Sequence, residues 1–170
     1  MSERERQTWL EAEPERVEAE RLEMARLAPE MAWLDDESAG GWEGIAPKWP
    51  FGRAEPDGLD NLLAGRRLRL RVEYSQAYPM VEPTLIPLDP EPPIERRVLH
   101  SWHVKGDGSL CLLQTATDWT GRDTAADLVV KASGWFIEYL LFDCGAVTTM
   151  TEDGLFADDS LDKLIEEWPA

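Results

Sequence analysis

The sequence predicts an α+β protein with an antiparallel sheet, because a helical pattern, several strand patterns and two further helical patterns follow one another along the chain. The 170 residues fit one compact domain, residues 1–170, and leave little room for a second. Hydrophobic residues make up 43% of the chain, so a core can form without disulfides or a metal ion.

The opening segment, residues 2–28, is predicted to be an amphipathic helix. Leu10, Val17 and Met24 recur every seven residues, which places them along one face. Pro14 fits a helix start or restart, because proline has no N–H group to donate inside a helix. This face is expected to pack on the core.

The middle of the chain is predicted to supply short strands. Residues 31–34 and 44–46 are apolar pieces between turn signals, and residues 47–58 form an irregular loop with three prolines and two glycines. Residues 67–74 alternate polar and apolar side chains, the pattern of a half-buried strand. Residues 83–88 are bounded by prolines, which favours an edge strand. The side chains expected to face inward from 67–74 are Leu68, Leu70, Val72 and Tyr74.

Two helices are predicted in the last third of the chain. Thr124 is a good N-cap with Asp127 three residues on, and Gly145 is a suitable stop. The residues expected on the buried face of this helix are Leu128, Val129, Ala132, Trp135, Phe136 and Leu140. Ser160 is predicted to cap a short final helix over residues 161–168.

The charge balance bears on partners and location. The chain has 34 acidic and 17 basic residues, a net charge of -17, which would repel a phosphate backbone. The basic run 66–71 is interpreted as the solvent face of a strand, so no nucleic-acid partner is expected. No apolar run approaches a membrane span and the first residues lack a signal-peptide pattern, so no membrane partner and a cytoplasmic location are expected. There Cys111 and Cys144 would stay reduced.

The irregular segment 99–119 carries the candidate chemistry. Gly106 and Gly108 allow a tight turn that would bring His103 back towards Cys111. A histidine beside a thiol can take its proton or stabilise a nearby oxyanion. Because a free thiol has a pKa of about 8.5, such assistance matters at neutral pH. We therefore interpret Cys111 and His103 as the candidate catalytic pair.

Four short motifs around Cys111 occur in a recognisable order. A Tyr-Pro-x-x-x-Pro element follows the alternating strand, a glycine precedes the cysteine by three residues, leucines flank the cysteine, and a tryptophan follows it by eight residues. In these motifs the chain resembles the ubiquitin-conjugating enzymes over roughly residues 5–145. The residues that carry the resemblance are Tyr78, Pro79, Pro83, Gly108, Leu110, Cys111, Leu112 and Trp119.

The resemblance implies the ubiquitin-conjugating-enzyme fold: an N-terminal helix, an antiparallel meander sheet, a cysteine loop and then helices. It implies that Cys111 accepts a ubiquitin-like modifier as a thioester from an adenylating activating enzyme. The modifier then passes to an amine on a target protein. No metal or organic cofactor is implied, and Tyr78, Pro79, Gly108, Leu110 and Trp119 would support the site.

The chain departs from the family at the residues before the cysteine. His103 stands at the position of the family's asparagine, Ser101 at that of its histidine and Trp102 at that of the intervening proline. A histidine can donate a hydrogen bond as the asparagine does, and it can also act as a base. The family's acidic residue near the lysine entrance is assigned to Asp118 as a supporting residue. Alternatives left open for that role are Asp123 and Asp143.

These departures and the small size resemble stand-alone bacterial members of the family. Such proteins accompany a ubiquitin-like modifier, an activating enzyme and often a metalloprotease. The resemblance therefore implies a role in antiphage defence. The target would be a phage protein or a cGAS-like nucleotidyltransferase.

Three other hypotheses compete. In the first, the chain is a non-catalytic binding or scaffold module on the same fold, and Cys111 is dispensable. In the second, it is a cysteine hydrolase that uses Cys111 and His103, although the sequence offers no obvious third residue to orient the histidine. In the third, it holds zinc through His100, His103, Cys111 and Cys144, although paired cysteines at zinc-site spacing are missing.

Overall fold

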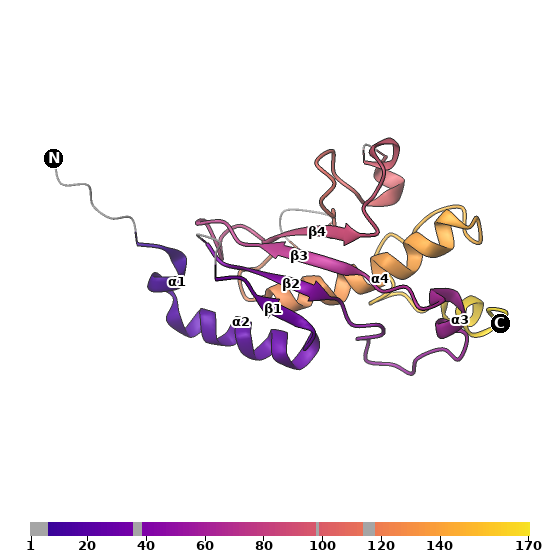
Figure 1. The fold of residues 1–170 in the computed structure, drawn as a ribbon, viewed down its shortest axis with the longest axis horizontal. Helices are drawn as coiled ribbons and strands as arrows, with labels where there is room; N and C mark the ends of the chain where they lie inside the picture. Colours follow the sequence, from indigo (N-terminus) through magenta and orange to yellow (C-terminus); the bar gives the residue numbers. More distant parts are fainter. Residues whose placement is uncertain (1–6, 36–38, 98, 114–117) are drawn as a thin grey trace.

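The computed structural model of the protein describes residues 7–35, 39–97, 99–113 and 118–170 (Figure 1). Within these residues a single sheet runs in the order β1-β2-β3-β4, and every neighbouring pair is antiparallel. The strands are β1 (Met31–Trp33), β2 (Gly41–Ile45), β3 (Arg69–Glu73) and β4 (Thr84–Asp89). The predicted α+β class with an antiparallel meander is therefore confirmed.

Helices precede, interrupt and follow the sheet. They are α1 (Trp9–Ala12), α2 (Pro14–Leu27), α3 (Leu59–Leu63), α4 (Ala125–Asp143) and α5 (Asp162–Glu166), with 3-10 turns η1 (Ile94–Arg96) and η2 (His100–Trp102). The predicted opening helix is divided in two, and Pro14 restarts it at the first position of α2. Residues 2–6 of that prediction lie outside the described residues.

Two details of the helix prediction are wrong. Helix α3 was not predicted, because five residues are too few to display a helical period. Helix α5 is flanked at its start by Leu161 rather than by the expected cap Ser160, whose N–H is instead bound by the Asp158 carboxylate at 2.8 Å.

The strand alternation in β3 is confirmed. The residues expected to face inward, Leu68, Leu70, Val72 and Tyr74, are all buried. The β4 strand lies at an edge, as its prolines indicate, and its register slips between Arg69 and Leu70, where Leu70 faces Pro87. A residue without an N–H group is tolerated at such an irregularity.

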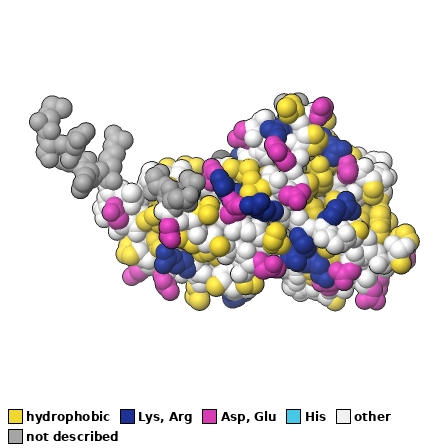
Figure 2. Space-filling model, in the orientation of Figure 1, with side chains coloured by type: hydrophobic (Ala, Val, Ile, Leu, Met, Phe, Trp, Pro, Cys, Tyr) yellow, Lys and Arg dark blue, Asp and Glu magenta, His cyan; other side chains and the backbone are white. Residues whose placement is uncertain are grey.

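The basic run 66–71 behaves as the solvent face of a strand. Arg69 and Arg71 both donate to the Glu43 carboxylate on the neighbouring strand, and Arg67 reaches Glu30. Figure 2 shows basic and acidic side chains interspersed on the face drawn. Three arginines of the run are therefore ion-paired within the protein, and Arg66 donates to the backbone carbonyls of Leu62 and Leu63.

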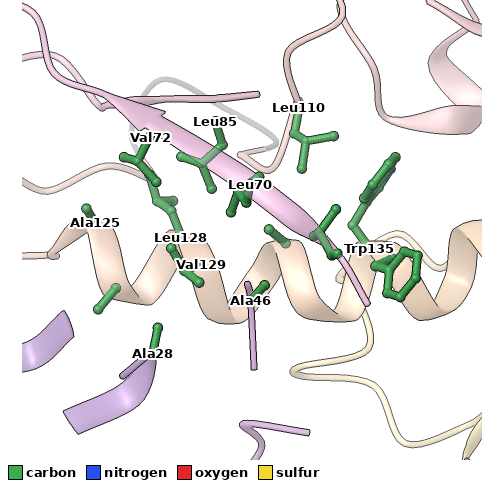
Figure 3. Close-up of a cluster of buried hydrophobic side chains, with 14 of the residues drawn as sticks. Ala28, Ala46, Leu70, Val72, Leu85, Leu110, Ala125, Leu128, Val129 and Trp135 are labelled. Carbon is green, nitrogen blue, oxygen red and sulfur yellow. The ribbon is translucent and has the colours of Figure 1, made fainter. Parts of the chain in front are cut away.

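The core lies between the sheet and α4 (Figure 3). The side chains gathered there come from the strands (Leu70, Val72 and Leu85), the segment before the cysteine (Leu110) and α4 (Leu128, Val129 and Trp135). The predicted buried face of α4 is confirmed, and Thr124 caps the helix through Asp127. Helix α4 is buried almost all round, which requires cover on more than its sheet side.

The segment after α4 supplies part of that cover. It folds back along the helix, where Gly134 leaves room for Leu155, since a Cβ on residue 134 would lie 3.2 Å from the Leu155 Cβ. Arg53 donates to the Leu155 carbonyl at 2.7 Å and forms an ion pair with Asp162. These contacts hold residues 151–156 beside α4, near the cysteine.

No helix among the described residues is both long enough and apolar enough to cross a membrane.

Candidate functional site

Cys111 follows a tight hairpin. Val104 and Leu110 form an antiparallel bridge, and Gly108 takes a positive φ of 90° in the turn between them. The N–H of Cys111 donates to the carbonyl of His103 at 2.8 Å. The predicted turn, which returns His103 to Cys111, is therefore present.

His103 occupies an unusual backbone position. Its φ of 51° and ψ of 39° lie in the left-handed region, at the end of η2. Among non-glycine residues, asparagine, aspartate and histidine adopt this conformation most readily. The hairpin therefore restricts which side chains residue 103 can carry without strain.

The exposed thiol of Cys111 shares a pocket of about 40 Å³ with His103. Helix α4 contributes Lys131, Trp135 and Glu138 to its walls, and the segment after α4 contributes Glu152, Asp153 and Phe156. A space of this size admits a water molecule or a small group, whereas organic-ligand pockets usually measure about 300–1,000 Å³. The pocket therefore suits an extended chain end or side chain that enters from solvent.

Glu138 lies in this pocket and was not predicted. Its side chain is 3% exposed, and Oε1 accepts a hydrogen bond from the Thr151 N–H at 2.7 Å. Burial raises the pKa of the Glu138 carboxyl, although its hydrogen bonds to Thr151 and the charge of His103 oppose that shift. The feature of the sequence that could have revealed Glu138 is an acidic residue with apolar neighbours on both sides within a helix that is buried.

Replacing Glu138 with glutamine is expected to flatten the pH dependence of stability. Because the folded-state pKa is raised, the native protein holds the proton more tightly than the unfolded chain. The free energy of unfolding should therefore fall as pH rises from about 4.3 through the raised pKa, then level off. Glutamine keeps an acceptor for Thr151 but cannot ionise. Urea unfolding between about pH 4 and 8 measures the difference. The exposed Glu95→Gln is the control, and parallel curves for wild type and Glu138→Gln would contradict the expectation.

Carboxylates line the approach to Cys111. Asp118, Glu152 and Asp153 share an open surface groove of about 330 Å³ with Leu112 and Lys131, beside the cysteine pocket. Of the three aspartates considered from the sequence, Asp118 is the one in this groove. Glu152 and Asp153 were missed, because the sequence does not show that the segment after α4 returns to the cysteine.

The other two candidate aspartates have different roles. The Asp123 carboxylate accepts hydrogen bonds from the N–H and the hydroxyl of Thr120, which lower its pKa and fix a turn. Asp143 forms an ion pair with Arg96 at the far end of α4. Neither lines the pocket of Cys111.

The supporting residues form a platform behind the site. The Trp119 indole N–H donates to the Pro79 carbonyl at 2.7 Å, and the Tyr78 and Trp119 rings lie 6.1 Å apart. Both aromatic side chains are buried. The chain leaving Cys111 is thus anchored on the Tyr78-Pro79 turn, while Leu110 is held by its N–H bond to Leu85.

Beneath this platform lies Glu20, which is fully buried. Its carboxylate accepts hydrogen bonds from the Tyr74 and Tyr78 hydroxyls and from the Ala125 N–H, and it pairs with Arg16 at 3.3 Å. Burial, followed by the charge of Glu20, raises the pKa of both tyrosines, so both remain donors.

Arg16 extends these contacts to the chain beyond Trp119. Its guanidinium donates to the Gly121 carbonyl at 2.8 Å and to the Asp123 carbonyl. Helix α2 is thereby tied to the segment that carries Asp118. We call Arg16, Glu20, Tyr74 and Tyr78 the buried polar network. The feature of the sequence that could have revealed this network is Glu20, an acidic residue between Val17 and Met24 on the apolar face of the opening helix.

The geometry of the site bears on two of the competing hypotheses, the zinc site and the hydrolase. Among the described residues, no group of three or more His, Cys, Asp or Glu side chains is arranged to hold a metal ion, so the four zinc ligands considered are not gathered. For a hydrolase, Glu138 shares the pocket with His103, but its carboxylate is hydrogen-bonded to Thr151 and no hydrogen bond joins it to the imidazole.

The chain gives no significant match when compared with protein-family models, with curated proteins or with solved structures. What the fold and the site define is a class: an α+β protein with an exposed cysteine, a neighbouring histidine and an acidic approach.

Proposed function

We propose that this protein is a ubiquitin-conjugating-enzyme-like thioester carrier with Cys111 as its nucleophile. The observation that supports this most is the exposed Cys111 thiol, held by its own backbone beside His103 and approached past carboxylates. The order of N-terminal helix, four-stranded antiparallel meander, cysteine hairpin and long helix agrees with the fold that the resemblance implies.

Two acyl transfers make up the proposed reaction. The Cys111 thiolate attacks the carbonyl carbon of the modifier's C-terminal glycine thioester, and the activating enzyme's thiolate leaves. An amine then attacks the new thioester, an amide forms and the Cys111 thiolate leaves. The His103 imidazole donates a hydrogen bond to the oxyanion formed in each attack, which stabilises the transition state. ATP is consumed by the activating enzyme.

The acidic approach suits a cationic acceptor. Asp118, Glu152 and Asp153 attract a lysine ammonium towards Cys111 and can receive the proton it loses. The proposed partners are a ubiquitin-like modifier, an adenylating activating enzyme and a target amine in bacterial antiphage defence. That context rests on the resemblance, whereas the acidic approach supports only the class of acceptor.

The proposal is tested by adduct formation with the cognate modifier, activating enzyme and ATP. Wild type should form an adduct that a thiol reductant cleaves, because a thioester exchanges with thiols. Cys111→Ser should form an adduct that resists reductant, because an oxyester does not. Denaturing gels with and without reductant measure both.

Cys144→Ala is the matched control and should form the wild-type adduct. Cys111→Ala should form none. An adduct on Cys111→Ala would mean that another residue is the nucleophile, and unchanged biological function in that variant would favour the non-catalytic scaffold instead.

A further inference from the structure

Lys131 places an amine in the pocket of the proposed nucleophile. The residue lies on α4 and lines the same 40 Å³ pocket as Cys111 and His103. Its Nζ lies 4.9 Å from the centre of the Phe156 ring, a cation–π contact that holds the side chain towards the pocket wall. The reaction proposed for Cys111 consumes amines, so a neighbouring amine bears directly on it.

Amines are scarce elsewhere in the chain. Of its 17 basic residues, four are lysines, and all four lie within the described ranges: Lys48, Lys105, Lys131 and Lys163. Lys48 forms ion pairs with Glu55 and Asp60, and the Nζ of Lys163, a residue of α5, lies 3.9 Å from a carboxylate oxygen of Glu167. Among the four, Lys131 is the one that lines the Cys111 pocket. The other basic residues are arginines, whose guanidinium groups are not acylated by a thioester.

We propose that Lys131 is an internal acceptor, to which an acyl group carried on Cys111 migrates. The inference rests on the proposed thioester role of Cys111. The neutral Nζ attacks the thioester carbonyl carbon, a C–N bond forms and the C–S bond breaks. The electron pair stays on the Cys111 sulfur as thiolate, and the amine proton passes to water or to a carboxylate of the approach.

Two physical effects set the rate of this migration. Confinement of both groups in one pocket raises the effective concentration of the amine far above that of any external lysine. Protonation of the amine acts in the opposite direction, because an ammonium cannot attack and lysines are largely protonated at neutral pH. Migration therefore competes with transfer to a target. Once acylated, Lys131 fills the pocket, and the carrier is closed to further amines.

The experiment loads Cys111 without any partner protein. The full chain is incubated with excess N-acetylglycine thioester of 2-mercaptoethanesulfonate, the donor is removed, and peptides are followed by mass spectrometry. The acyl group should leave Cys111 and appear on Lys131 at least about tenfold faster than on Lys105. The rate should not depend on protein concentration, and it should rise up to about tenfold per pH unit between about pH 7 and 9.

Variants separate migration from direct acylation. Lys131→Arg keeps the positive charge and should prolong the thioester, whereas Lys105→Arg, in the exposed hairpin, should not. In Cys111→Ala, Lys131 should remain unacylated. Equal acylation of Lys131 in Cys111→Ala, or an acyl group spread evenly over the four lysines, would overturn the inference.

The remaining outcomes distinguish the inference from the proposed function. A Cys111 thioester that only hydrolyses overturns the Lys131 inference and leaves the carrier role standing. Failure to load Cys111 under excess donor overturns both. Migration to Lys131 in a protein that forms no adduct with its cognate modifier supports the inference and counts against the proposed function.

Discussion

Glu20→Ala is expected to lower the free energy of unfolding by about 3–5 kcal/mol, the usual loss when one member of a buried ion pair is removed. The alanine variant leaves the Arg16 guanidinium without its carboxylate. It also leaves the Tyr74 and Tyr78 hydroxyls and the Ala125 N–H without their acceptor. Each buried donor without a partner adds a desolvation penalty. Urea unfolding at neutral pH measures the loss.

Two further variants make this test specific. Glu20→Gln should lie between wild type and Glu20→Ala, because the amide keeps one acceptor oxygen but points an NH₂ group at other donors. Glu23→Ala removes a carboxylate from the same helix, where it forms an exposed pair with Arg26, and should change stability little. Equal losses of unfolding free energy in Glu20→Ala and Glu23→Ala would mean that the buried polar network contributes no more to stability than an exposed ion pair does.

The same variant should disturb the site. Arg16 holds the Gly121 and Asp123 carbonyls, and Trp119 is anchored on the turn whose Tyr78 hydroxyl Glu20 binds. Without Glu20, amide hydrogen exchange should accelerate over residues 119–125 more than over the hairpin 103–111, which is held by its own backbone bonds. The network therefore connects the surface of α2 to the chain that follows Cys111.

Sequence patterns predicted the elements whose burial follows a single local period. The apolar spacing of α4 and the alternation of β3 both report which face of one element meets the core, and both predictions are confirmed. Helix α3 was not predicted, because five residues complete little more than one turn. Ser160 has the composition of a cap, but the Asp158 side chain binds its N–H and the helix begins later.

The site divides in the same way. The approach of His103 to Cys111 follows from glycines within one short hairpin, so local turn chemistry predicts it. Glu20 lies more than one hundred residues before its partner Ala125, and Glu152 reaches the cysteine pocket only because the chain returns along α4. Such contacts depend on how elements pack together, and no local period encodes them.

His103→Gly is expected to slow transfer from the Cys111 thioester to an amine by about 10²–10³-fold, the usual effect of removing one oxyanion donor. Glycine adopts the left-handed backbone of residue 103 without strain, so the loss isolates the imidazole from the shape of the hairpin. Thioester formation should also slow, since the same donor assists that attack. It should slow less than the transfer step, because exchange of an acyl group between two thiols is intrinsically fast. Single-turnover discharge of preformed thioester to free lysine measures the transfer step.

His103→Asn separates hydrogen-bond donation from proton transfer. Asparagine tolerates the left-handed backbone and can donate through its amide, but it cannot act as a base. If His103 works as a donor, the asparagine variant should discharge near the wild-type rate while the glycine variant remains slow. If both variants are equally slow, the imidazole works as a base instead. Wild-type discharge by His103→Gly would mean that residue 103 shapes the hairpin and that Cys111 acts without it.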